Sequence, residues 1–302
     1  MTVAVCLEAD VTSIASVKRD HAGLATLQFA GGGVPPSVDD RPNLLGRLVR
    51  EQQLQNSPCT AVLSADSYQL IQAELAELPD DERRDAARWQ IRERIDYPPE
   101  EAVIDLFEVA PFGGEKRPLT YIVSAPQKIL RGQVQLIEQS DLAVKAIDIP
   151  EFSLRNICEL FTEDDRGLAI LLLLEQSGVL VIVRDGTLYL VRWLSTGMAD
   201  LLPFAEGDYE ALTEQLDTIV LEIQRSFDHC ESTFNLPLVS RLLVAQTQRE
   251  IPAVVTYLND SLSTSVESFD FKDVLVVPDE SEQLQLNQHL LAIGGALRQE
   301  NS

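Results

Sequence analysis

LAILLLLEQSGVLVIVRDGTLYLVRWL, residues 168–194, is the stretch that decides the fold of this chain. Its apolar runs predict three short strands, Leu168–Leu174, Gly178–Arg184 and Thr187–Leu194, because short apolar runs bounded by turn residues are typical of buried strands. The Asp185–Gly186 pair between the last two strands is the strongest local signal for a hairpin in the sequence. The stretch is therefore expected to fold as a meander of three strands.

The same order of elements occurs at the start of the chain. There the expected strands are Val3–Leu7, Ser13–Lys18 and Leu24–Phe29, and in both halves helices alternating with strands follow the meander. This order, made twice, is that of actin-like nucleotide-binding folds. We therefore predict an α/β protein, a two-domain actin-like fold with the duplicated βββαβα order of the ribonuclease H-like class. A protein with that fold can be either an active ATPase or a scaffold that has kept the shape and lost the ATPase activity.

The chain divides into a first domain, residues 1–164, and a second domain, residues 165–302, at a turn rich in acidic residues. Within the first domain the composition changes abruptly, and about residues 78–125 are predicted to form a small inserted α+β subdomain with one helix and a pair of strands. A helix is predicted over residues 68–75, just before the insert, and a single C-terminal helix over about residues 284–297.

Composition limits the partners. The chain has 302 residues and a formal net charge of −24, from 48 acidic and 24 basic side chains. Nucleic acids and anionic membrane surfaces attract basic patches, so this charge argues against both and would suit a basic partner segment. The four cysteines are scattered without a Cys-x-x-Cys pair, which predicts buried thiols such as Cys6 in a reducing compartment. The N-terminus does not resemble a signal peptide and no apolar run spans a membrane, so we expect a soluble, cytoplasmic chain.

Four motifs, in order along the chain, resemble one protein family. They are WQIRERIDYPPEEAVIDLFEV (89–109), DGTLYLVRWLSTG (185–197), LEIQRSFDHCESTF (221–234) and LAIGGALR (291–298). Together they resemble the bacterial PilM family of type IV pilus assembly proteins, most closely its MshI-type members, which serve the mannose-sensitive haemagglutinin (MSHA) pilus. A second relative is the cytoplasmic domain of the type II secretion GspL proteins. A GspL chain normally continues through the membrane, so the sequence favours the pilus type.

The resemblance implies a fold similar to actin and FtsA and a position under the inner membrane, held there by partners. Such proteins bind the cytoplasmic tail of a single-span inner-membrane protein, PilN-like or MshJ-like, and the complex connects to the pilus motor ATPases. In the family the tail docks between the first subdomain and the insert, which implies Trp89, Arg92, Ile95 and Tyr97 as partner-binding residues. The residues alone also fit a solvated helix laced with ion pairs, with Trp89 in the core.

Nucleotide binding needs features that this sequence has lost. An actin-like ATPase holds phosphates in two hairpin turns, where glycines let backbone N–H groups approach and acidic residues hold Mg²⁺ and water. The first turn falls in LEADVTSIAS, residues 7–16, without glycine; the second falls in LLEQSGVLVI, residues 173–182, with one. The adenosine turn falls in VAQTQREIP, residues 244–252, without glycine. The candidate nucleotide-binding residues left in the two hairpin turns are Asp10, Thr12, Ser13, Glu175, Ser177 and Gly178.

These departures predict a protein without catalytic residues and without a cofactor. Glu8, Asp10 and Glu175, with no Lys or Arg expected nearby, would repel a triphosphate unless a cation bridged them. The primary hypothesis is therefore a non-enzymatic scaffold. Two alternatives stay open: an actin-like ATPase that binds ATP with Mg²⁺ and so controls a partner, and a sugar or acetate kinase of the same superfold.

The three histidines and one pair of glycines are expected to have structural roles. None of His21, His229 and His289 has the spacing of a metal site, so no metal is expected. The Gly294–Gly295 pair predicts close helix packing rather than a phosphate-binding loop.

Overall fold

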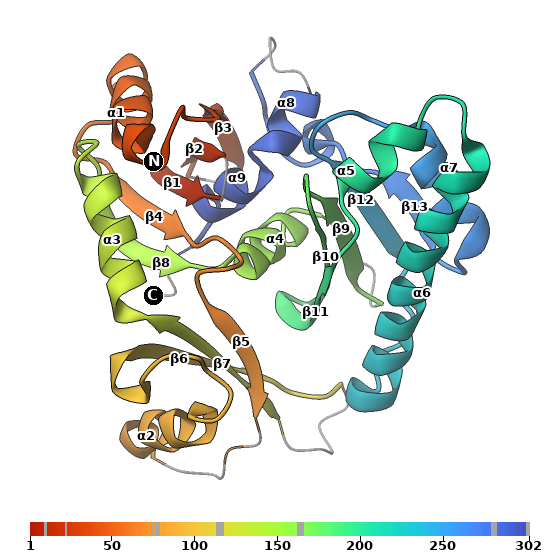
Figure 1. The fold of residues 1–302 in the computed structure, drawn as a ribbon, viewed down its shortest axis with the longest axis horizontal. Helices are drawn as coiled ribbons and strands as arrows, with labels where there is room; N and C mark the ends of the chain where they lie inside the picture. Colours follow the sequence, from red (N-terminus) through yellow and green to blue (C-terminus); the bar gives the residue numbers. More distant parts are fainter. Residues whose placement is uncertain are drawn as a thin grey trace.

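The computed structural model describes residues 1–8, 11–21, 23–73, 75, 79–112, 118–161, 166–278 and 283–299. Figure 1 shows two lobes, each built on a five-stranded sheet, with short helices lying between the two sheets. A smaller three-stranded sheet lies beside the first lobe. The two lobes, the central helices and the small sheet together position the sites described below.

The first sheet has the strand order β3-β2-β1-β4-β8. Its strands are β1 (Thr2–Leu7), β2 (Thr12–Arg19), β3 (Ala25–Gly33), β4 (Pro58–Val62) and β8 (Ala143–Asp148). The first three strands pair antiparallel as a meander, and β4 and β8 add in parallel on the other side of β1. Two helices, α1 (Arg41–Glu51) and α3 (Gln127–Glu138), cover its outer face (Figure 1).

The second sheet repeats this arrangement in the order β11-β10-β9-β12-β13. Its strands are β9 (Leu168–Leu173), β10 (Gly178–Arg184), β11 (Thr187–Leu194), β12 (Arg241–Gln246) and β13 (Ser265–Ser268). The strands β9 to β11 form an antiparallel meander, and β12 and β13 add in parallel beyond β9. The helices α6 (Tyr209–Phe234) and α7 (Pro252–Ser261) cover the outer face. The duplicated order predicted from the sequence is confirmed.

Each central strand is apolar on both faces because helices cover both sides of its sheet. In β9, Leu168, Ile170 and Leu172 face the interior between the lobes, whereas Ala169, Leu171 and Leu173 face α6 and α7. In β1, Ala4 and Cys6 face the interior, whereas Val3, Val5 and Leu7 face α1 and α3. The period of two residues explains why these strands read as unbroken apolar runs.

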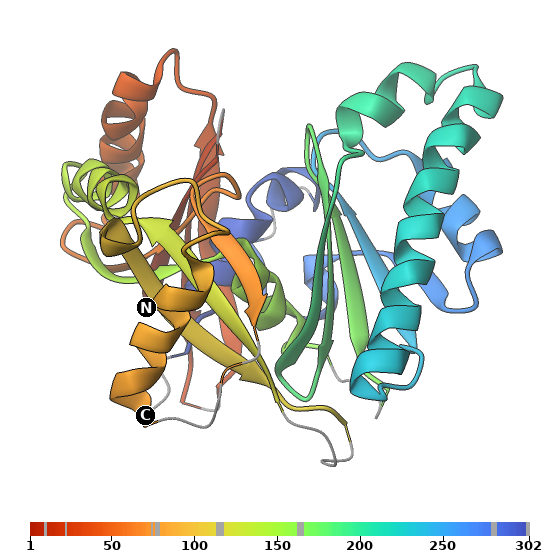
Figure 2. The same ribbon diagram turned by 60° about the horizontal axis from the view of Figure 1, so that its bottom comes forward.

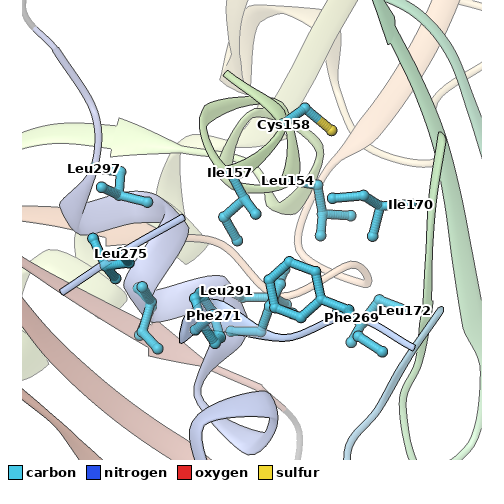
Figure 3. Packing of buried hydrophobic residues seen from close by; sticks show 14 of the residues in the cluster. Leu154, Ile157, Cys158, Ile170, Leu172, Phe269, Phe271, Leu275, Leu291 and Leu297 are labelled. Carbon is cyan, nitrogen blue, oxygen red and sulfur yellow. The ribbon is translucent and has the colours of Figure 1, made fainter. Parts of the chain in front are cut away.

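The two helices between the lobes are exchanged between the halves of the chain. The helix α4 (Pro150–Cys158), which ends the first half, packs against β9, β10 and β11 of the second sheet. The helix α9 (Leu290–Ala296) packs against β1, β2 and β4 of the first sheet, although the sequence assigns residues 165–302 to the second domain. Figure 3 shows the side chains of α4, α9 and β9 meeting in the core that results. One hydrophobic cluster therefore joins both lobes.

Two glycines let α9 pack closely, Gly294 against α4 and Gly295 against the first sheet. A Cβ atom on Gly294 would overlap the main-chain oxygen of Ser153 in α4, and a Cβ on Gly295 would lie 2.5 Å from Cγ2 of Val62 in β4. Asn156 of α4 adds a hydrogen bond from Nδ2 to the Gly294 carbonyl at 3.0 Å. The close helix packing predicted for this pair is confirmed.

Replacing Gly294 with Ala is expected to lower the free energy of unfolding by at least about 2 kcal/mol, because the helices must move apart and open gaps in the shared core. Urea unfolding followed by circular dichroism measures the change. Gly132→Ala is the matched control: Gly132 lies in α3 with open space around it, so Ala should stabilise the protein by roughly 0.5–1 kcal/mol. Equal effects of the two substitutions would contradict the role given to the crossing.

The insert is built on a sheet of order β5-β7-β6. Its elements are β5 (Gln69–Ala73), α2 (Asp80–Ile91), β6 (Ala102–Val109) and β7 (Leu119–Pro126). Figure 2 shows it beside the first lobe, with one end reaching α6 of the second lobe. There the Phe112 N–H donates to the Phe234 carbonyl at 2.8 Å.

The helix predicted over residues 68–75 is wrong, because this segment forms β5. Its buried residues Ile71 and Ala73 alternate with exposed Gln72, and the strand pairs with β7 from Gln69 opposite Ser124 onward. The partner strand lies about 50 residues away, and local spacing does not reveal such pairing. The insert sheet thus begins before the boundary predicted from the sequence.

The single C-terminal helix predicted over about residues 284–297 is two helices, α8 (Gln283–Gln288) and α9. His289 breaks the run with φ −112° and ψ 15°, and its ring contacts Ser13 of the first lobe. The break turns the chain from the second lobe onto the first sheet. Short 3₁₀ helices lie at Val38–Asp40, Pro99–Glu101, Leu202–Phe204 and Phe271–Asp273.

Candidate functional site

A cavity of about 500 Å³, here called the interdomain cleft, lies between the lobes. Its walls include the turns that follow β1, β9 and β12, the loop after β4 and the start of α9. The carboxyl ends of parallel strands are where α/β folds commonly bind ligands. The lining residues that matter below are Glu8, Asp66, Glu175, Ser177, Trp193 and His289.

Two tight turns face this cleft from equivalent positions in the two halves. The Glu8 N–H donates to the Val11 carbonyl at 2.9 Å, and the Leu174 N–H donates to the Ser177 carbonyl at 2.9 Å. Each turn follows the central strand of its sheet, β1 or β9. They therefore occupy the places that the duplicated order assigns to the two phosphate-binding hairpins.

Glycines on neighbouring segments, outside the turns, allow the backbone to pack closely here. A Cβ on Gly32 of β3 would overlap the main-chain oxygen of Thr12, and a Cβ on Gly197 would overlap the main-chain nitrogen of Ser177. Because only glycines inside the turns were considered from the sequence, Gly32 and Gly197 were not identified as the residues that allow this close packing. Their role follows from strand pairing, such as Gly32 opposite Ser13, which local sequence does not show.

The predicted nucleotide-binding residues occupy different places. Two line the cleft: Glu175 and Ser177. Three are buried at the starts of the strands that leave the turns: Thr12, Ser13 and Gly178. Asp10 lies outside the described residues. The described members thus gather around the two turns, and their role in nucleotide binding stays a prediction.

His289 lies in the cleft, although only a structural role was predicted for it from the sequence. Its Nδ1 lies 2.9 Å from Oγ of Ser13, which is 276 residues away. Burial lowers the pKa of His289 to about 4, so its ring is neutral at neutral pH. It therefore contributes hydrogen bonding and no positive charge to the cleft.

Glu8 is the acidic residue with the most unusual environment in the cleft. Burial raises the pKa of its carboxyl to about 7. The expectation of no Lys or Arg near these acids is wrong here, because Nη2 of Arg41 donates to the main-chain oxygen of Glu8 at 2.5 Å. Arg41 reaches this point because α1 packs on the first sheet. In the described part of the chain, the Glu8 carboxylate itself has no hydrogen-bonding or ion-pairing partner.

Replacing Glu8 with Gln is expected to raise the free energy of unfolding by about 1 kcal/mol near pH 8 and to have little effect near pH 4. The folded protein holds this proton more tightly than the unfolded chain, whose carboxyl has a pKa near 4.5. The stability that Glu8 contributes is therefore present below about pH 4.5 and is lost as the pH rises through about 7. Urea unfolding at several pH values measures the difference.

The control for that prediction is Glu231→Gln, at an exposed position of α6. It should leave the pH profile of stability unchanged. Parallel profiles for wild type and Glu8→Gln would show that Glu8 is solvated rather than buried.

A buried carboxyl connects the cleft wall to the first lobe. Glu151 in α4 accepts a hydrogen bond from the Tyr68 hydroxyl at 2.5 Å and one from Nε1 of Trp193 at 3.1 Å. Burial raises the pKa of Glu151, and both donors offset part of that rise. The network joins the loop before β5, the helix α4 and β11, and it fixes the orientation of the Trp193 ring at the cleft.

A second cavity, of about 670 Å³ and here called the insert groove, lies between the insert, β8 and α4. Val103 of β6 and Ile147 of β8 face it and are 42% and 40% exposed. Phe152 forms an apolar wall, and the charged residues of the lining are two arginines and two aspartates: Arg155, Arg298, Asp105 and Asp148. Both β6 and β8 lie at the ends of their sheets. The groove therefore combines exposed apolar side chains with two strand edges.

Asp148 forms an ion pair with Arg298 in the insert groove. Its Oδ2 lies 3.4 Å from Nε of Arg298. Burial raises the pKa of Asp148 to about 6, although the Ile149 N–H and the two arginines act in the opposite direction. Asp148 is thus mostly ionised at neutral pH and paired with Arg298.

The alternation of β6 places the insert groove and α2 on opposite faces of the insert sheet. Val103 lines the groove, whereas Ala102 and Ile104 pack with Ala87 and Ile91 of α2. A ligand in the groove would therefore lie on the face of the insert sheet opposite the buried side of α2, and α2 reaches the groove through Arg84, which pairs with the lining residue Asp105 at 3.7 Å.

The predicted partner-binding residues lie on the α2 side of the insert and line neither of these cavities. Trp89 is 64% exposed and not in the core, and the Arg92 guanidinium lies 4.4 Å from its ring centre. Ile95 and Tyr97 pack against the insert core, and the Tyr97 hydroxyl is 2.8 Å from Oγ of Ser124. Their contact with a partner stays a prediction.

Ion pairs do occur along α2, as expected if this segment is a solvated helix. Arg88 pairs with Asp85 at 3.1 Å and Arg92 with Glu93 at 3.5 Å, at largely exposed positions. Such pairs add little stability in water. The helix surface therefore combines solvated ion pairs with one exposed tryptophan.

Three further observations concern membrane spans, metal sites and cysteines among the described residues. No described helix is long and apolar enough to cross a membrane, and no group of three or more His, Cys, Asp or Glu within the described ranges is placed to hold a metal ion. All four cysteines are buried free thiols, as predicted for Cys6.

Comparison with solved structures relates this fold to known proteins. A chain of the PilM-PilN type IV pilus biogenesis complex superposes with a TM-score of 0.78 at 20% identity, covering 98% of this chain and 97% of that one. The cytoplasmic domain of EpsL, an inner membrane component of the type II secretion system of Vibrio cholerae, gives 0.51 at 10% identity, over 99% and 96%.

A Bacteroides thetaiotaomicron protein described as having an actin-like ATPase fold and unknown function gives a TM-score of 0.52 at 9% identity, over 96% and 95% of the two chains. With the duplicated sheets, these similarities establish a two-domain actin-like fold, as the sequence predicted. No family model matches the chain, and no curated protein sequence matches it.

Proposed function

We propose that this chain is a non-enzymatic, PilM-like scaffold of type IV pilus assembly and that it binds the cytoplasmic tail of a PilN-like single-span membrane protein. The observation that carries the proposal is the insert groove, with its exposed apolar residues between two strand edges. The structural similarity to a chain of the PilM-PilN complex over nearly its whole length supports it.

The insert groove has the chemistry to hold an extended peptide. A free strand edge offers main-chain N–H and C=O groups, and an added peptide strand gains affinity from them and specificity from side-chain contacts. Val103 and Ile147 supply apolar contacts on facing walls. Burying two such half-exposed side chains contributes on the order of 1–2 kcal/mol. The net charge of −24 would also attract a basic tail over longer distances.

The finer assignment to an MSHA-type pilus rests on the four sequence motifs. We propose that the chain is an MshI-type protein, that its partner is MshJ-like, and that it lies on the cytoplasmic side of the inner membrane without entering it. A connection to a pilus motor ATPase belongs to the same proposal. The similarity to the EpsL domain keeps a type II secretion role as the alternative.

The absence of catalysis is also part of the proposal. It is supported by turns without the usual glycines and by Glu8 and Glu175, which oppose a triphosphate. The alternative, a nucleotide-dependent ATPase of pilus assembly, is favoured by one observation: the interdomain cleft still lies between two equivalent turns.

Calorimetric titration with a synthetic tail peptide of the PilN-like or MshJ-like protein tests the proposal. A dissociation constant of roughly 1–50 μM is expected. Ile147→Asp, which places a charge in the apolar wall, should weaken binding by about 10-fold or more. Leu221→Asp is the matched control, because Leu221 is 46% exposed on α6, away from the insert groove. Thermal unfolding confirms that both variants fold.

Absence of peptide binding to the folded wild type would refute the proposal. Trp89→Ala separates the two candidate surfaces: if it abolishes binding while Ile147→Asp does not, the tail docks on α2 and the groove assignment fails.

A further inference from the structure

The interdomain cleft is acidic where a nucleotide site would be basic. Glu8, Asp66 and Glu175 line it, and among its described lining residues there is no Lys or Arg. His289 is neutral at neutral pH because burial lowers its pKa to about 4. Exposed acidic side chains alone do not define a site, since most are simply solvated. Glu8 and the apolar wall distinguish this cleft from an ordinary acidic surface.

Glu8 differs from the two acids at the rim. Asp66 and Glu175 are exposed, and Asp66 accepts a hydrogen bond from the Ser64 hydroxyl at 2.5 Å. Glu8 is half-buried and lines the cavity, and its carboxylate has no hydrogen bond or ion pair among the described residues, although Arg41 donates to its main-chain oxygen. Partial removal from water makes the ionised form of this carboxylate costly, and a cation bound beside it would relieve that cost.

The indole ring of Trp193 forms part of the same cavity wall. Trp193 lines the cleft, and its indole N–H is held by Glu151 at 3.1 Å, so the ring is fixed before any ligand arrives. Leu63, Leu174 and Leu291 extend the apolar part of the wall. A fixed indole near carboxylates is the setting in which proteins bind organic cations through cation–π attraction. Strongly hydrated metal ions gain nothing from such a wall.

We propose that the interdomain cleft binds a small organic cation, an ammonium or guanidinium group on an apolar chain, with the charged group between Glu8 and the Trp193 ring and the chain against the leucines of the wall. The volume of about 500 Å³ lies within the range of small-molecule sites. The cleft has thus kept the position of the ancestral ligand site and reversed its charge preference. This proposal is independent of peptide binding in the insert groove.

Titration with agmatine tests the proposal, and spermidine serves as a second probe. The protein has two tryptophans, so Trp89→Phe leaves Trp193 as the only one, at the cleft wall. Near pH 8, where Glu8 is ionised, agmatine should give a saturable change in Trp193 fluorescence and a matching calorimetric binding curve. We expect a dissociation constant in the range of roughly 10–500 μM.

Two variants in the Trp89→Phe background test whether agmatine binding depends on Glu8. Glu8→Gln should weaken agmatine binding by about 10-fold or more, as loss of a charged partner does. This variant is expected to be at least as stable as its parent, so unfolding does not explain a loss. Glu231→Gln, on the exposed face of α6, should bind as the parent does.

Three outcomes would overturn the proposal. One is the lack of a saturable response to agmatine and spermidine up to about 10 mM. Another is equal binding by the parent and Glu8→Gln. The third is a competing ligand class: ATP with Mg²⁺ binding more tightly than either amine, or MgCl₂ alone giving the same Glu8-dependent response. None of these results depends on the tail peptide, so a failure here is distinguishable from a failure of the proposed scaffold function.

Discussion

The close crossing of α4 and α9 is the constraint on which the rest of the structure depends. The main chain at Gly294 lies against the main chain at Ser153, so no side chain fits between the two helices. Because each helix packs on the sheet of the opposite half, the crossing joins both lobes in one hydrophobic cluster. The relative position of the sheets, and hence the width of the space between them, follows from this contact.

Both candidate sites are built around the first turns of α4. Pro150 lines the interdomain cleft, and Phe152 lines the insert groove. Between them Glu151 is fully buried and bonded to Tyr68 and Trp193. One rigid element thus shapes a wall of each cavity. Under the proposed scaffold function, the interdomain cleft can lose nucleotide chemistry while α4 keeps the shape of the insert groove.

Much of the fold followed from the sequence because its signals are local. The apolar runs of β1 and β9 and the Asp185–Gly186 turn predicted the duplicated meander, and the Gly294–Gly295 pair predicted close helix packing. The failures were all long-range. The strand β5 depends on pairing with β7, and Arg41 reaches Glu8 only because α1 folds back onto the first sheet.

The candidate sites were less predictable for the same reason. The turns at Glu8 and Glu175 lie at the cleft because each follows the central strand of its sheet, and their role in nucleotide binding stays a prediction. The walls of the insert groove come from Val103 and Ile147, which are 44 positions apart and carry no motif. Trp89, which the family resemblance implies as a partner-binding residue, lies on α2 on the other face of the insert sheet, and its contact with a partner stays a prediction.

Hydrogen–deuterium exchange with and without the partner's tail peptide tests the central claim, that the insert groove is the partner-binding surface. The account predicts slower amide exchange in residues 102–105, 122–126 and 146–153, which form its walls, and no change in residues 244–252 of the interdomain cleft. Protection confined to residues 84–97, on and just after α2, or protection nowhere, would contradict it.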